Sequence, residues 1–174
     1  MLCPLTPFIK LMNGITFLAA VPAGGWHRQS SDWMAIPMTN EQKELVQTSW
    51  QKVEPIADTA ASLFYGRLFE IDPSTQPLFS KTDMADQKKK LMQVIGIAVR
   101  GLDRVDETLA VVAELGKRHG AYGVTDRHYD SVGSALLWTL EKGLGDQFTP
   151  DVKDAWATVY GILANTMKGA VVTA

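Results

Sequence analysis

From Thr39 onward, apolar residues recur every three to four positions, the spacing that gives an α-helix one buried face. The first such stretch follows Thr39, which suits an N-cap, and Gln42 stands where its side chain can reach back to the Thr39 backbone. The apolar face of this stretch carries Leu45, Val46, Trp50 and Val53. The pattern therefore predicts an amphipathic helix that begins at a capping box.

Proline and glycine breaks separate further stretches of the same period. These predict helices from Pro55 to Ile71, from about Asp83 to Leu102, from Asp106 to His119, from a cap at Asp126 to the glycines at 143 and 145, and from the Thr149-Pro150 cap to Met167. No segment alternates with period two for long enough to predict a strand. The sequence thus indicates an all-α fold of six or seven helices.

Four glycines stand inside helical runs, at positions 96, 116, 133 and 161. Each costs helix stability of roughly 1 kcal/mol against alanine. Such positions are favoured where helices cross closely or where a flat ligand lies against the backbone.

Residues 1–37 have a different pattern, interrupted by prolines and glycines. The apolar run from Leu11 to Val21 precedes Pro22-Ala23-Gly24-Gly25, which loosely resembles a signal peptide and is too short to span a membrane. One interpretation is an export or tethering signal. The favoured one is a disordered extension, or an upstream start before Met38, so we expect a domain over 38–174 in the cytoplasm.

Composition excludes several function classes. The net charge of −2 gives no electrostatic basis for binding nucleic acid. The single Cys3 forms no intrachain disulfide, and with His27, His119 and His128 as the only histidines a Cys/His zinc site is disfavoured. No nucleotide-binding fingerprint and no hydrolase grouping of Ser, His and acid occurs, and without a Cys-x-x-Cys-His motif any haem is held non-covalently.

Three residues are candidates for chemistry when taken alone. His119 ends a helical pattern just before a glycine break, where a neutral imidazole can bind iron, although a lone histidine is more often a surface or core residue. Gln87 lies on a mainly apolar face and is costly to bury without hydrogen bonds, so the alternative is that it faces solvent beside the lysines at 88–90. Tyr65 lies inside the apolar run Leu63-Phe64-Tyr65, and by itself it would be a core aromatic with its hydroxyl at the edge.

In this order the residues resemble the globins, over about 39–168. The closest resemblance is to single-domain bacterial globins related to the haem domain of flavohaemoglobins, and to neuroglobins. The segments that carry it are Ser49-Trp50, Leu63 to Phe69, Pro77-Leu78-Phe79, Lys90-Leu91-Met92, Leu115 to His119 with Tyr122-Gly123-Val124, Ala155-Trp156 and Tyr160-Gly161. The resemblance implies a fold of six to eight helices sandwiching haem b, iron protoporphyrin IX bound without covalent attachment.

The resemblance also implies which residues hold this haem. His119 matches the proximal histidine, the one bond from protein to iron. Phe79 matches a phenylalanine that packs on the haem ring, and Lys90 a basic residue that pairs with a propionate. Val124 would touch the haem edge, and Tyr129 matches a tyrosine that supports the proximal histidine.

On the opposite side, the resemblance places Tyr65 and Gln87 next to bound gas, with Leu91 narrowing the pocket. A hydroxyl and an amide can both donate hydrogen bonds to a ligand that gains negative charge, and such donors count for more in a dry pocket. The implied function is reversible binding of oxygen, nitric oxide and carbon monoxide, with tight oxygen binding suited to storage, scavenging or sensing.

An enzyme remains the alternative: a nitric oxide dioxygenase supplied with electrons by a separate reductase. A haem-free globin fold serving as an interaction module is a third possibility, which Phe79 and His119 together disfavour.

The match departs from flavohaemoglobins at Thr173, where they have a glutamate. We expect a monomer or weak homodimer without a transmembrane helix.

Overall fold

A computed structural model describes residues 38–172 of the chain. The expectations for residues 1–37 and for Thr173 lie outside these residues. Within 38–172 there are six α-helices and no strand, which confirms the all-α prediction. The helices are α2 (Asn40–Val53), α3 (Ala57–Ile71), α4 (Met84–Arg100), α5 (Val105–Ala121), α6 (Asp126–Leu144) and α7 (Pro150–Val172), with short 3₁₀ turns η2 (Glu54–Ile56), η3 (Pro73–Phe79), η4 (Gly101–Asp103) and η5 (Gly145–Gln147) between them.

Local capping signals account for most helix starts. The Gln42 N–H donates to Thr39 Oγ1 at 3.1 Å, and the Thr39 N–H donates to Gln42 Oε1 at 3.0 Å, so the predicted capping box is confirmed. At α7 the Val152 N–H donates to Thr149 Oγ1 at 3.3 Å, as the Thr149-Pro150 pair predicts. These side chains satisfy donors that the first helical turn leaves free.

The prediction that Asp126 caps α6 is wrong. The N-cap is Thr125, and Asp126 is already the first helical residue. The reason lies at the third helical position, where His128 Nδ1 accepts the Thr125 N–H at 3.2 Å. Because the side chain of the third helical residue binds back to the Thr125 N–H, as in a capping box, Thr125 is the N-cap of α6.

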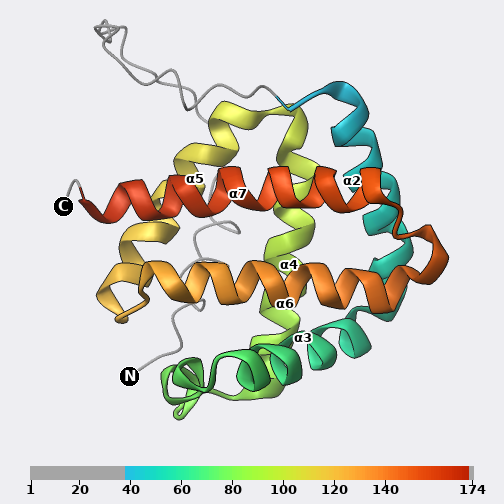
Figure 1. The fold of residues 1–174 in the computed structure, drawn as a ribbon. Helices are drawn as coiled ribbons and strands as arrows, with labels where there is room; N and C mark the ends of the chain where they lie inside the picture. The colour runs from blue at the N-terminus through green and yellow to red at the C-terminus, as the bar shows by residue number, and fades with distance from the viewer. Residues whose placement is uncertain (1–37, 173–174) are drawn as a thin grey trace, which may run out of the picture.

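The helices pack as crossed layers (Figure 1). α5 packs most extensively on α7, α3 on α6, and α2 on α7, while α6 and α7 run side by side across the front of the view. The main core lies where these helices meet, with the indole rings of Trp50 and Trp156 6.2 Å apart. The Trp156 indole N–H donates to Ser49 Oγ at 2.9 Å, so this buried polar atom is satisfied and α7 is joined to α2.

Close helix crossing explains two of the interior glycines. A Cβ on Gly116 would lie 2.4 Å from the Met167 carbonyl oxygen, so α5 and α7 approach at this point more closely than any side chain allows. A Cβ on Gly133 would lie 2.6 Å from the ring of Tyr160. A Cβ on Gly161 would meet nothing within 4 Å, so crossing does not explain that glycine.

No helix in the described part of the chain has the length and apolar character needed to cross a membrane.

Candidate functional site

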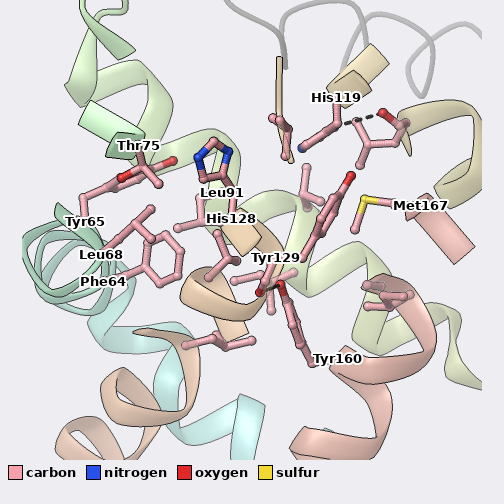
Figure 2. A pocket seen from close by; sticks show the side chains of 18 of the residues that line it. Phe64, Tyr65, Leu68, Thr75, Leu91, His119, His128, Tyr129, Tyr160 and Met167 are labelled. Atoms are coloured by element: carbon pink, nitrogen blue, oxygen red, sulfur yellow. Dashed lines mark hydrogen bonds between the residues drawn. The ribbon is translucent and has the colours of Figure 1, made fainter. Parts of the chain in front are cut away.

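The helices enclose a cavity of about 310 Å³ (Figure 2). Its walls come from α3, η3, α4, α5, α6, α7 and the loop after α5, and they are mostly aliphatic and aromatic. All of the predicted site residues except Lys90 line it: Tyr65, Phe79, Gln87, Leu91, His119, Val124 and Tyr129. The fold therefore brings together residues spread over 65–129 of the sequence.

His119 lies in the last turn of α5 with its ring in the cavity wall. Its Nδ1 is 2.9 Å from the carbonyl oxygen of Leu115, and because a carbonyl only accepts, Nδ1 carries the proton. The neutral ring then presents an unprotonated Nε2. Burial lowers the pKa of His119, which outweighs the opposing effect of the Leu115 bond, so the neutral form is favoured at neutral pH.

The loop after α5 returns the chain to the cavity. Gly123 has a φ of 81°, a left-handed conformation that glycine adopts without strain. The chain then folds back so that the Val124 N–H donates to the carbonyl oxygen of His119 at 3.2 Å. The glycine break noted in the sequence thus places Val124 in the cavity wall beside His119.

Tyr129, from the first turn of α6, lies next to His119. The two rings are 6.3 Å apart and stacked, with 30° between their planes. The Tyr129 hydroxyl is buried without a hydrogen-bond partner among the described residues, and burial raises its pKa. Tyr160 of α7 donates its hydroxyl to the Tyr129 carbonyl oxygen at 2.5 Å, which holds this part of α6 against α7. A buried orphan hydroxyl marks a place where a bound group can supply a partner.

Tyr65 lies across the cavity in a cluster of aromatic rings. It is 4% exposed, and its ring meets Phe64, Phe69 and Phe79 edge-on or tilted at centroid distances of 5.1 to 5.9 Å. Such edge contacts are favourable for aromatic quadrupoles and orient the ring. Phe79 ends η3 and also lines the cavity, so its ring is held between this cluster and the open space.

Gln87 enters the cavity wall from the first turn of α4. Asp83 caps this helix, with its Oδ1 accepting the N–H groups of Ala85 at 2.9 Å and Asp86 at 3.3 Å. Gln87 is only 2% exposed, so the interpretation in which it faces solvent beside the lysines is excluded. Leu91, one turn further along α4, lines the same wall.

Lys90 is the exception among the predicted residues. Its side chain is buried, and its ammonium pairs with the carboxylate of Asp86, one turn earlier on α4. It does not line the cavity.

Sequence reasoning missed several polar or aromatic residues of the cavity wall, among them Thr75, Tyr122 and His128. Thr75 is hidden in η3, where its Oγ1 donates to the Asp72 carbonyl at 2.7 Å. Tyr122, three positions after His119, is 42% exposed and so stands at the mouth of the cavity. For His128 a signal was present, since Thr-x-x-His has the spacing of a capping box.

The donor set fits one kind of cofactor. No group of three or more His, Cys, Asp or Glu side chains that could hold a metal occurs within 38–172. The Nε2 of His119 is a nitrogen in the cavity wall that could bind a metal carried by a cofactor. A flat, largely apolar group that brings its own metal donors would suit such a cavity, where His119 could supply one further ligand and the apolar walls could cover the group. Haem has this chemistry.

Comparison with known proteins gives concordant results. A family model described as Globin matches residues 62–167. The chain is 29% identical over 137 residues to the Flavohemoprotein of Bacillus subtilis (strain 168), covering 76% of this chain and 34% of that protein, so it spans about a third of that relative's length. It is 30% identical over 143 residues to Neuroglobin-1 of Oncorhynchus mykiss and 29% identical over 143 residues to Neuroglobin of Chaenocephalus aceratus, in both cases with 75% of this chain and 90% of the relative covered.

Proposed function

The chain belongs to the globin family of haem-containing, gas-binding proteins, and from this premise we propose that it holds haem b in the central cavity through His119 and binds diatomic gases there. One observation carries the proposal: the Leu115 bond to Nδ1 leaves the Nε2 of a neutral, partly buried imidazole free in the cavity wall. Haem, when bound, supplies an iron atom that takes oxygen, nitric oxide or carbon monoxide as a ligand.

The residues of this chain then act on the cofactor from two sides. His119 would be its protein ligand, with Tyr129 stacked behind the imidazole. Phe79 and Val124 would pack against the ring, and the apolar walls would exclude water. Lys90 would meet a propionate only by exchanging its present partner, Asp86.

Opposite His119, Tyr65 and Gln87 would act on the gas. Both are buried polar side chains that line the cavity, and a hydroxyl and an amide N–H can each donate to a ligand that carries partial negative charge. Bound oxygen accepts such bonds better than carbon monoxide does. We therefore propose tight oxygen binding with slow release, which suits storage, scavenging or sensing rather than delivery.

The direct test is an absorption spectrum of the protein purified and supplied with one equivalent of haemin. We expect an intense Soret band, a shift of that band when the reduced protein is exposed to carbon monoxide, and loss of stable haem retention in His119→Ala. A chain that takes up no haem, or a His119→Ala variant with the same spectrum and the same haem retention, would reject the proposal.

Nitric oxide dioxygenase activity is the alternative function, favoured by the similarity to a flavohemoprotein. The reaction combines nitric oxide, oxygen and one electron to give nitrate, so sustained turnover needs an electron from outside this chain. Continuous nitric oxide consumption with an added reductase and a nicotinamide donor would support the enzyme. A single stoichiometric burst under the same conditions would support a binding protein.

A further inference from the structure

A second imidazole lines the cavity, and both of its nitrogens have partners. His128 Nδ1 accepts the Thr125 N–H at 3.2 Å, and Nε2 lies 3.3 Å from Ser74 Oγ (Figure 2 shows the ring of His128). A backbone N–H can only donate, so Nδ1 is unprotonated. The proton of the neutral ring is therefore on Nε2, where it is donated to Ser74.

The bonds continue from Ser74 to a buried carboxylate. Ser74 gives Asp72 Oδ1 two hydrogen bonds, from its hydroxyl at 2.5 Å and from its N–H at 3.2 Å. The other oxygen, Oδ2, accepts the Ser131 hydroxyl at 2.7 Å. Asp72 is 2% exposed, and the bonds from Ser74 and then Ser131 hold its pKa below the ordinary value. It is thus an ionised anchor between α3 and η3.

This chain of bonds joins two walls of the cavity. At one end, Asp72 caps η3 and Ser74 lies in its first turn. The same 3₁₀ turn carries Thr75 and Phe79, which line the cavity. At the other end, His128 precedes Tyr129 and holds the N–H of Thr125. Thr125 follows Val124, whose own N–H is bonded to the His119 carbonyl. A shift of the His128 ring would therefore displace Thr125 and, through the Val124 bond, the end of α5 that carries His119.

We propose that His128, held by Ser74 and Asp72, is a positioning residue that sets the His119 wall of the cavity relative to the η3 wall and so governs how firmly haem is retained. The inference rests on the proposed haem-binding function. Two bonds tie α6 to this network and can be tested separately: Ser131 donates directly to Asp72, whereas the bond from Ser74 is the one that reaches His128 and the loop before it.

Two serine substitutions separate these roles. Ser74→Ala and Ser131→Ala each remove one hydroxyl bond to Asp72, and only Ser74→Ala cuts the link to His128. Ser134→Ala is the matched control. Ser134 lies on α6 with His128 and Ser131, and its hydroxyl bonds to the Asp130 carbonyl of the same helix and not to Asp72. Two quantities are measured on the haem-loaded protein: the rate of haem transfer to an excess of an apo-globin acceptor, and the iron–imidazole stretching band of the reduced form by resonance Raman.

We expect Ser74→Ala and His128→Ala to lose haem about five- to tenfold faster, the factor for the loss of one net hydrogen bond, with a shifted or broadened iron–imidazole band. Ser131→Ala and Ser134→Ala should stay within about twofold of the parent with the band unchanged. His128→Gln should recover part of the retention, because its amide can donate to Ser74 as Nε2–H does.

Two results would overturn the inference while leaving the proposed function intact. One is a parent protein that binds haem, with Ser74→Ala and His128→Ala behaving like Ser134→Ala. The other is Ser131→Ala with the same effect as Ser74→Ala on both measurements, which would mean that the bonds to Asp72, and not the link from Ser74 to His128, govern haem retention. A parent protein that takes up no haem would instead reject the proposed function.

Discussion

The Nδ1–H of His119 donates to the carbonyl oxygen of Leu115, one turn earlier in α5, at 2.9 Å. This bond fixes the tautomer and the ring orientation together, because rotation of the ring would leave a partly buried N–H without its acceptor. It is thus the helix backbone of α5 itself that presents Nε2 to the cavity. In metal sites such an outer bond typically determines ligand orientation and basicity.

Replacing His119 by glycine should create a cavity that free imidazole can fill. We expect His119→Gly to lose haem rapidly and added imidazole to restore a Soret band, at a helix cost of roughly 1 kcal/mol. Titration of the variant with imidazole, followed by absorption, measures this. Lys117→Ala, an exposed neighbour, should need no imidazole. A haem complex of His119→Gly that is indifferent to imidazole would mean that another side chain holds the iron.

Tyr65→Phe should release oxygen faster, by roughly tenfold for the loss of one hydrogen bond in a dry pocket. Carbon monoxide release should change much less, since that ligand accepts hydrogen bonds poorly. Stopped-flow displacement of oxygen gives the rate. Tyr122→Phe is the matched control, because Tyr122 also lines the cavity but stands at its exposed mouth. Equal oxygen release rates for the parent and Tyr65→Phe would refute the assigned role of the Tyr65 hydroxyl.

Asp72 should make stability fall in acid. The Ser74 and Ser131 bonds lower its folded pKa below the ordinary 3.8, so the unfolded chain binds the proton more readily. Its contribution is present above about pH 4 and is lost as the pH falls through the folded pKa. Urea unfolding of the parent and of Asp72→Asn between pH 7 and pH 2 should give a flatter acid limb for the variant. Asp154→Asn, at an exposed carboxylate, should keep the parent's pH dependence.

Gly116→Ala and Gly161→Ala should have opposite effects on the free energy of unfolding. A Cβ at 116 would lie 2.4 Å from the Met167 backbone, which cannot move without separating α5 from α7, so a loss of about 2–3 kcal/mol is expected. A Cβ at 161 meets nothing within 4 Å, so the better helix propensity of alanine should add up to about 1 kcal/mol. Denaturant unfolding of both apo variants checks the pair, and similar losses at the two positions would contradict the close-crossing explanation.

Local chemistry made much of this molecule predictable from the sequence. Apolar periodicity and the Thr39 and Thr149 caps predicted helices because both signals act within a few residues. The glycines after His119 predicted the end of α5 only to within two residues: the helix continues through Gly120 to Ala121, and it is Gly123 that takes a left-handed conformation. The expected cap at Asp126 failed because Thr125 and His128 form a competing reciprocal bond, which depends on which side chains face one another at the helix start.

Tertiary structure decided what faces the cavity. The sequence left Gln87 between solvent and interior, and only the packing of α4 buries it. Lys90 matched a haem-contacting position, yet the fold pairs it with Asp86 outside the cavity wall. His128 and Ser74 meet across 54 positions, a distance at which no periodic or capping signal acts. By itself the sequence determined the helices and the residue type suited to hold iron, because these follow from neighbours along the chain. The protonated nitrogen, the buried donors and the bonds between the two cavity walls depend on where distant segments come to rest against each other, which only the folded structure specifies.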